Sequence, residues 1–322
     1  MKTFIVSGCA GFIGARVCEL LLKEGYTVIG FDNLEPYYDI RLKQYRLEKL
    51  QRFKNFSFLM LDLTDRQNLF KELSRVKAEA IIHLAAAPGV RHSIENPGYY
   101  LSVNTFGTLN LLELAISCDI GKFVFASTSS VYAGENPPFL ESSRCDRPLS
   151  PYASSKRSSE LICYNFHYLH KLDISILRLF TVYGPAGRPD MGVFRFIKWA
   201  IEESPIRIFG SLEQRRDFTY IDDVARAFLM ALKPLGFEII NIGNAKSHSL
   251  GELLEIISKK TGKRLKIEIE DFKKGDMNLT HANVELAKKT LGWEPQTSLE
   301  DGIEKTVLWF RENWDLIEKL NV

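Results

Sequence analysis

A tyrosine and a lysine stand four residues apart in the segment Tyr152-Ala-Ser-Ser-Lys156. If this segment begins a helix, both side chains lie on the same face of it. A tyrosine phenol has an ordinary pKa of about 10, and a neighbouring ammonium group lowers that pKa because it favours the phenolate. We therefore expect Tyr152 to serve as a general base, with Lys156 as its cationic partner. The alternative is an ordinary pair of residues on a helix surface.

Hydroxyl side chains gather shortly before this pair, at residues 127–130. They follow an apolar run at 122–126 that is typical of a buried strand, so we expect them at the carboxyl end of that strand. One of these hydroxyls could share a hydrogen bond with the oxygen atom of a substrate.

Three glycines, Gly8, Gly11 and Gly14, follow the first apolar run of the chain. The first permits a tight turn, the second lets the backbone approach a pyrophosphate, and the third lets a helix pack closely on the preceding strand. The N-terminus of that helix offers free N–H groups and the positive end of its dipole to phosphates. The spacing predicts a dinucleotide site, with a glycine-rich turn without a ligand as the alternative.

Acidic residues end the second and third apolar runs. Asp32 stands roughly 20 residues beyond the glycine loop, where a carboxylate meets the adenosine ribose hydroxyls. Because a carboxylate would repel a 2′-phosphate, the predicted cofactor is NAD rather than NADP. Asp62-Leu63 could flank the adenine, although an ordinary turn aspartate fits that spacing nearly as well.

Short apolar runs alternate with segments of helical spacing in the first half of the chain. This alternation is typical of right-handed βαβ units and of a parallel sheet covered on both faces. The predicted fold class is therefore α/β, with a Rossmann-like, doubly wound parallel sheet. Strands are expected at 3–7, 27–31, 56–59, 80–84, 122–126 and 174–177, and helices at 12–23, 99–116 and 152–169.

The alternation becomes less regular after residue 181. Residues 183–190 are expected to form an irregular loop because they are rich in glycine and proline. We expect residues 1–180 to bind NAD, with their sheet completed by part of 215–245, and 181–322 to form mainly a smaller α/β substrate-binding region over the carboxyl edge of the sheet. That region should contain helices at 194–203, 221–232, 250–261 and 299–314 and strands at 206–209, 238–242 and 265–269.

Composition limits the partners of this chain. Its 322 residues include 42 basic and 40 acidic side chains, a net charge of +2, so neither a nucleic acid nor a membrane partner is expected. The apolar start of the chain is better explained by the glycine loop than by a signal peptide. Five scattered cysteines indicate a reducing compartment, hence a cytoplasmic location. No histidine spacing suggests a metal site, and His83 is expected to be a packed core residue.

Together these motifs resemble the extended short-chain dehydrogenase/reductase superfamily over essentially the whole chain. Within its sugar-nucleotide epimerase/dehydratase branch, segments 32–39 with 42–43, 88–97 and 180–191 are similar to UDP-glucuronate 4-epimerases. The resemblance implies a homodimer that holds NAD tightly and regenerates it in each turnover. The implied reaction converts UDP-glucuronate to UDP-galacturonate through a transient 4-keto sugar.

The resemblance also implies roles for individual residues. The implied catalytic residues are Tyr152, Lys156 and Thr128, the last of which a neighbouring serine could replace. The implied cofactor-binding residues are Gly8, Gly11, Phe12, Ile13, Gly14, Asp32, Asn33, Lys43, Asp62, Leu63, Leu84, Ala85, Ala86, Tyr152 and Lys156. The implied substrate-binding residues are Arg91, Ser129, Ser130, Thr181, Arg188, Phe209, Arg216 and Asp276.

Two of these positions bear on the identity of the sugar. Arg188 lies in the loop that faces the C6 end of the sugar in this family, and an arginine fork suits a carboxylate. The alternative is a loop arginine that pairs with Asp190. Thr181 replaces the asparagine of hexose epimerases, while Ala87-Pro88 and Ala186 depart from the family pattern. UDP-glucose 4-epimerase, UDP-glucuronate decarboxylase and an inactive nucleotide-binding protein therefore stay open as alternatives.

Overall fold

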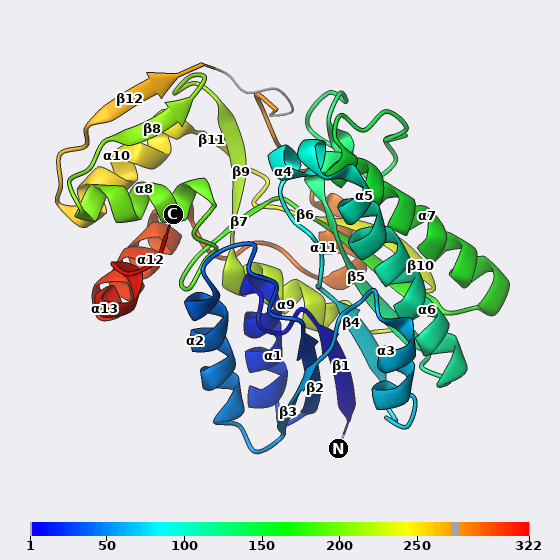
Figure 1. Ribbon diagram of the computed structural model, residues 1–322. Helices are drawn as coiled ribbons and strands as arrows, with labels where there is room; N and C mark the ends of the chain where they lie inside the picture. The colour runs from blue at the N-terminus through cyan, green and yellow to red at the C-terminus, as the bar shows by residue number, and fades with distance from the viewer. Residues whose placement is uncertain (1, 272–276, 322) are drawn as a thin grey trace.

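The computed structural model of the chain describes residues 2–271 and 277–321. Its largest element is a seven-stranded sheet in the order β10-β6-β5-β4-β1-β2-β3 (Figure 1), and all neighbouring strands are parallel. The predicted doubly wound sheet is thus confirmed. Its strands are β1 (Thr3–Ser7), β2 (Thr27–Asp32), β3 (Phe56–Met60), β4 (Ala80–His83), β5 (Lys122–Thr128), β6 (Asp173–Leu179) and β10 (Phe237–Ile242).

Helices cover both faces of this sheet. On one face lie α1 (Phe12–Lys23), α2 (Ile40–Gln51) and α9 (Ile221–Met230), and on the other lie α3 (Arg66–Leu73), α6 (Gly107–Ser117) and α7 (Pro151–His170). Side chains alternate along each strand, so Phe4 and Val6 belong to the core beneath α1 and Ile5 to the core beneath α6. Because both faces are covered, every residue of β4 and β5 is buried, as their apolar runs predict.

The remaining elements form a smaller region beside the sheet, at the upper left of Figure 1. Its strands are β7 (Thr181–Tyr183), β9 (Arg215–Tyr220) and β11 (Ser247–Ser249) in one sheet, and β8 (Ile206–Phe209) paired with β12 (Ile267–Glu270) in another. Its helices are α8 (Gly192–Ile201), α10 (Leu250–Thr261), α12 (Leu299–Glu312) and α13 (Trp314–Ile317), whereas α11 (Glu285–Leu291) packs against β10 of the large sheet. Although β10 comes from the second half of the chain, it extends the large sheet beside β6. The division near residue 180 stays a prediction.

The structure differs from the sequence predictions around residue 100. The helix expected at 99–116 is divided into α5 (Pro97–Tyr100), a π-helical segment (Leu101–Phe106) and α6. The wider turn accompanies inward hydrogen bonds of the buried Asn104 side chain, which accepts from the Ala87 amide (2.7 Å) and donates to Ser155 Oγ (2.9 Å). Also not predicted are α2, α3, α4 (Val90–Glu95), α11, β7, β9 and β11.

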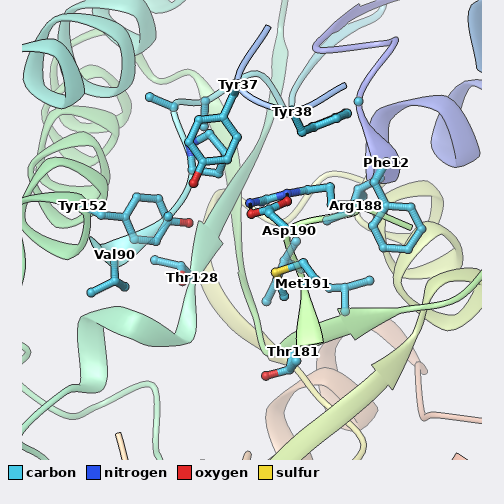
Figure 2. A pocket seen from close by; sticks show the side chains of 18 of the residues that line it. Phe12, Tyr37, Tyr38, Val90, Thr128, Tyr152, Thr181, Arg188, Asp190 and Met191 are labelled. Carbon is cyan, nitrogen blue, oxygen red and sulfur yellow. Dashed lines mark hydrogen bonds and ion pairs between the residues drawn. The ribbon is translucent and has the colours of Figure 1, made fainter. Parts of the chain in front are cut away.

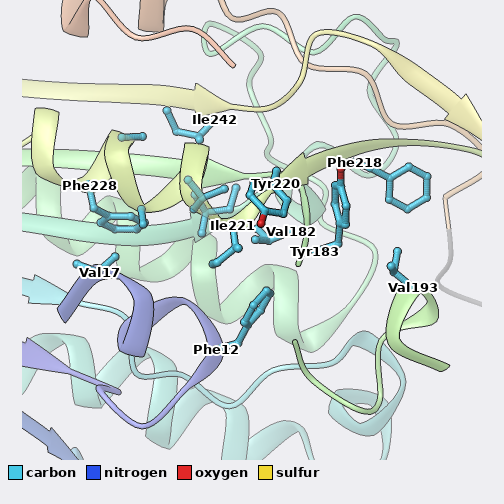
Figure 3. Packing of buried hydrophobic residues seen from close by; sticks show 14 of the residues in the cluster. Phe12, Val17, Val182, Tyr183, Val193, Phe218, Tyr220, Ile221, Phe228 and Ile242 are labelled. Carbon is cyan, nitrogen blue, oxygen red and sulfur yellow. The ribbon is translucent and has the colours of Figure 1, made fainter. Parts of the chain in front are cut away.

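One aromatic and aliphatic cluster joins the large sheet to the smaller region (Figure 3). Phe12 belongs to the same buried cluster as Ile221 and Phe228 of α9 and Tyr183 and Phe218 of the smaller sheet. Because Phe12 is the first residue of α1, this packing fixes the glycine loop relative to the smaller region. In the part of the chain that the structure describes, no helix is long and apolar enough to span a membrane.

His83 is buried at the end of β4, as predicted. Its Nδ1 lies 2.7 Å from Ser7 Oγ and its Nε2 3.0 Å from Thr108 Oγ1, whose hydroxyl donates to the Asn104 carbonyl oxygen. The ring therefore donates from Nε2, accepts at Nδ1 and is neutral. Burial holds the pKa of His83 well below its ordinary value, and the charge of Lys156 acts in the same direction.

We predict that His83 makes the fold sensitive to acid. Since its pKa is lower in the folded chain, the unfolded chain binds the additional proton below about pH 6.5, so the free energy of unfolding falls as the pH drops further, by up to about 1.4 kcal/mol per pH unit. His83→Gln should remove this part of the pH dependence between pH 6.5 and 5. Urea unfolding of both proteins across this range measures it, and a constant difference between the two curves would contradict the prediction.

Candidate active site

One cavity of about 720 Å³ lies between the carboxyl edge of the large sheet and the smaller region. Every predicted site residue that the structure describes lines this cavity, although these residues come from segments far apart in the sequence. Asp276 lies outside the described residues. The structure thus brings the predicted residues together, while the role of each one stays a prediction.

The glycine loop has the geometry of a phosphate cradle. Gly8 has a φ of +72°, and a Cβ there would lie 2.6 Å from the Ala85 amide nitrogen. A Cβ at Gly14 would lie 2.0 Å from the Gly8 carbonyl oxygen, so neither position accepts a side chain. Gly11 is the N-cap of α1 and no side chain caps this helix. Its first amides therefore suit a pyrophosphate oxygen that supplies the missing acceptor.

Acidic side chains stand at the carboxyl ends of β2 and β3. Asp32 Oδ1 accepts from the Leu34 amide (2.8 Å) and from Lys43 Nζ (3.1 Å), and both charged side chains of that pair are buried. Asn33 Nδ2 donates to Asp62 Oδ2 at 2.7 Å. Carboxylate oxygens here fit ribose hydroxyls, and Lys43 is already neutralised by Asp32, so the arrangement disfavours a 2′-phosphate.

Tyr152 and Thr128 lie close together in the cavity (Figure 2). Ser150 caps α7 by accepting from the Ala153 amide (3.1 Å), which places Tyr152 in the first turn. Burial raises the pKa of the Tyr152 phenol, and the hydrogen bond with Thr128 and the charge of Arg188 only partly oppose that rise. The expected lowering of this pKa is therefore wrong for the structure as it stands.

Lys156 explains why that expectation fails. It is buried one turn after Tyr152, with Nζ 4.1 Å from the centre of the Phe125 ring. Burial lowers the pKa of Lys156 to about 7, although the charges of Cys163 and Glu160 oppose this. Because a lysine that is only partly protonated near neutral pH exerts a weak field, desolvation of both groups outweighs their proximity.

A buried ion pair holds the strand of Thr128 against the helix of Tyr152. Glu160 of α7 accepts from Arg178 of β6 through Nε (2.9 Å) and Nη2 (2.7 Å), and both side chains are buried. The Ser127 hydroxyl donates to Glu160 Oε1 at 2.5 Å. Ser127 directly precedes Thr128, so this network fixes the end of β5 relative to α7.

Arg188 and Asp190 face Tyr152 across the cavity (Figure 2). Arg188 donates from Nε and Nη2 to the two carboxylate oxygens of Asp190, at 3.0 and 2.5 Å. Its Cζ lies 5.6 Å from the centre of the Tyr37 ring. Burial alone would lower the pKa of Arg188, but the charge and hydrogen bonds of Asp190 raise it overall. The structure thus shows the loop pair that the sequence offers as the alternative.

A third group of lining residues suits an anionic ligand rich in oxygen atoms. The Arg91 guanidinium lies 4.8 Å from the centre of the Phe209 ring, and Arg216 Nη1 donates to the Arg215 carbonyl oxygen at 3.0 Å. Gln214 also lines the cavity, and its buried Nε2 has no hydrogen-bond partner among the described residues, so it is available to an acceptor of a ligand. Across residues 2–271 and 277–321, no group of three or more His, Cys, Asp or Glu side chains is placed to hold a metal ion.

Comparison with known proteins agrees with this geometry. Residues 4–243 match the NAD dependent epimerase/dehydratase family. The chain belongs to this family. It is 52% identical to the UDP-glucuronate 4-epimerase of Thermodesulfobacterium geofontis, and the match covers 100% of both chains.

Solved structures of the epimerase/dehydratase family share the fold. The UDP-glucuronic acid 4-epimerase of Bacillus cereus in complex with UDP-glucuronic acid and NAD has a TM-score of 0.89 at 35% identity, covering 97% of this chain and 99% of that one. The UDP-glucose 4-epimerase of Thermotoga maritima with UDP-glucose has a TM-score of 0.89 at 31% identity, covering 97% and 100%.

The sequence patterns miss four residues in or next to this epimerase/dehydratase site. Glu160 and Arg178 carry charge at buried positions inside otherwise apolar patterns, a signal that could have identified them. Tyr37 stands in a segment that carries the family resemblance, but spacing alone assigns it no role. No pattern in the sequence marks Gln214.

We predict that the bond between Ser127 and Glu160 affects turnover more than stability. Ser127→Ala leaves Glu160 bound to Arg178 and to Arg157 (Nη1–Oε2, 2.9 Å), so the free energy of unfolding should fall by only about 0.5–1.5 kcal/mol. Turnover should fall roughly tenfold because Thr128 is no longer held in place. Glu160→Gln leaves Arg178 with an uncompensated charge and should cost about 3–5 kcal/mol. Chemical unfolding and steady-state kinetics measure both effects; full turnover in Ser127→Ala would show that the network serves stability alone.

Proposed function

We propose that this chain is an NAD-dependent UDP-sugar 4-epimerase that converts UDP-glucuronate to UDP-galacturonate. One observation carries the proposal. A single cavity contains a phosphate cradle, a half-buried tyrosine with a neighbouring hydroxyl, and an arginine facing that tyrosine. The 52% identity to a UDP-glucuronate 4-epimerase over the full length supports the choice of sugar.

The residues on the cofactor side fit NAD. The amides after Gly11 would hold the pyrophosphate, and the Asp32 carboxylate would accept from the adenosine ribose. When bound, NAD would supply the reversible hydride transfer at sugar C4 that 4-epimerisation requires. The remaining work, which is proton transfer and control of the sugar, falls to side chains of the chain itself.

Tyr152 would move the proton. As the phenolate it accepts the proton of the sugar 4-hydroxyl and returns it to the 4-keto oxygen after the sugar has turned. Thr128 donates a hydrogen bond to that phenolate, and Lys156 adds positive charge when protonated.

UDP-glucose 4-epimerisation is the second candidate. One observation favours it: Arg188 is paired with Asp190 rather than open to a sugar carboxylate. The UDP-glucose 4-epimerase structure also shares the fold, with a TM-score of 0.89 at 31% identity. The two reactions share all the proton-transfer residues and differ only at the C6 end of the sugar.

The test compares the two sugars in the unchanged chain and in Arg188 variants. A hydrogen bond to a charged group contributes about 1.5–3 kcal/mol, so Arg188→Ala should lower kcat/KM for UDP-glucuronate roughly ten- to a hundredfold. Activity with UDP-glucose should fall much less, and Arg188→Lys should restore only part of the loss. Chromatography of the product sugars measures these activities in the unchanged chain and in both variants. Release of carbon dioxide would indicate a decarboxylase. Equal losses on both sugars would remove the support for a carboxylate substrate.

We also propose a homodimer. Large apolar side chains are exposed on α5, the π-helical segment and α7, which pack against one another. A twofold interface between copies of this chain would bury them. They are Tyr99, Leu101, Phe106, Leu161, Tyr164, Tyr168 and Leu169.

The dimer predicts a definite effect of charge on this surface. Phe106→Asp combined with Leu161→Asp should give a folded monomer, because carboxylates would be buried in the interface. Leu308→Asp, at an exposed position on α12, is the matched control and should leave the dimer intact. Light scattering on the three proteins measures the mass; a monomeric parent chain at micromolar concentration would refute the dimer.

A cytoplasmic location completes the proposal. All five cysteines are unpaired, and four of them are buried. Free cysteines in this number are typical of a reducing compartment.

A further inference from the structure

A carboxylate of the protein already occupies the arginine that the proposed function assigns to the sugar. Asp190 receives both prongs of Arg188, from Nε at 3.0 Å and from Nη2 at 2.5 Å. This is the two-pronged geometry that a sugar carboxylate also prefers. The two side chains are 20% and 24% exposed and line the cavity of Tyr152 (Figure 2). A sugar carboxylate must therefore displace Asp190 or bind beside its negative charge.

The chemistry of 4-epimerisation makes this arrangement useful. The 4-keto sugar has to present its other face to the same side of the cavity. Its C6 carboxylate is bonded to C5, the carbon next to C4. The carboxylate must therefore leave its first position in every turnover. A guanidinium held by the sugar alone would lose its only partner at that moment, with only 20% of its side chain exposed to water.

We propose that Asp190 is a positioning residue that competes with the sugar carboxylate for Arg188 and takes back the guanidinium while the sugar turns. The inference rests on the proposed function, because a sugar without a carboxylate has nothing to exchange. The Tyr37 ring lies over the guanidinium at 5.6 Å. Its hydroxyl is held against Gly89, where a Cβ would lie 2.2 Å from it. Arg188 can therefore keep its place while its partner changes.

Competition and simple orientation of Arg188 predict opposite changes in the affinity for UDP-glucuronate when the charge of Asp190 is removed. If Asp190 holds the guanidinium nine-tenths of the time, the affinity for the sugar carboxylate is about tenfold below its intrinsic value. Removing the negative charge should therefore tighten binding of UDP-glucuronate. If Asp190 only oriented Arg188 for the sugar, the same change would weaken that binding.

The experiment uses Asp190→Asn, whose amide oxygen can still accept one hydrogen bond from Arg188. Calorimetry should show UDP-glucuronate binding about tenfold more tightly than in the parent chain, with UDP-glucose and UDP within twofold. Turnover of UDP-glucuronate should fall several-fold, because the carboxylate is released more slowly. Asp190→Glu keeps the competing charge and should keep the weaker binding. The matched control is Asp222→Asn, which removes a carboxylate bound to Arg16 (2.7 Å) outside the cavity and should change neither affinity.

Each outcome decides between the hypotheses. Unchanged or weaker binding of UDP-glucuronate by Asp190→Asn overturns the competition, as does an equal gain for both sugars. If Asp190→Asn does not fold, the affinity of Asp190→Glu for UDP-glucuronate decides instead. An affinity that differs from that of the parent chain overturns the competition. A parent chain that binds the two sugars alike and leaves UDP-glucuronate unconverted overturns the proposed function too, and that failure is visible without any variant.

Discussion

The active-site geometry depends on one buried ion pair, between Glu160 of α7 and Arg178 of β6. Through Ser127 the pair reaches the end of β5, and through the Tyr132 hydroxyl, which accepts from Arg178 at 2.8 Å and donates to Asn241 at 2.7 Å, it reaches β10. Such a pair adds little net stability, because desolvation of both charges offsets their attraction. Its effect is to permit one arrangement of four elements, since any shift would leave a buried charge unpaired.

The same burial that fixes this arrangement sets the proton affinities of the site. Lys156 is buried and Tyr152 is half-buried, and desolvation drives each toward its neutral form: the pKa of the phenol rises and the pKa of the ammonium falls to about 7. A charged residue two turns from Tyr152, Glu160, favours protonation of Lys156. The network that holds the catalytic residues in place therefore also supports the charge that the phenolate needs. Position and electrostatics are coupled in this site.

Much of the fold and the site follows from local sequence patterns. Helix 250–261 and strand 206–209 agree at both ends with α10 and β8, because both have clear periodicity and clear end signals. The cavity could be anticipated because parallel strands end at one edge, which gathers Gly8, Asp32 and Thr128. The sequence could not predict how burial and neighbouring charges combine to set the pKa of a site residue. This combination depends on contacts between segments far apart in the chain, as the wrong expectation for Tyr152 shows, and the π-helical turn around Asn104 is likewise a tertiary effect.

Two cationic side chains of the cavity are already paired with carboxylates of the protein, and a third lies against an aromatic ring. Lys43 is bound to Asp32, Arg188 to Asp190, and Arg91 lies against the Phe209 ring. A ligand that enters therefore exchanges partners with these groups instead of meeting bare charges, so each contact adds less affinity than its geometry suggests. In this reaction the sugar must leave its first position and turn before it is reduced, so weak binding at the sugar end is an advantage. Tight binding is useful at the glycine loop and at the diphosphate, which do not take part in the turn of the sugar.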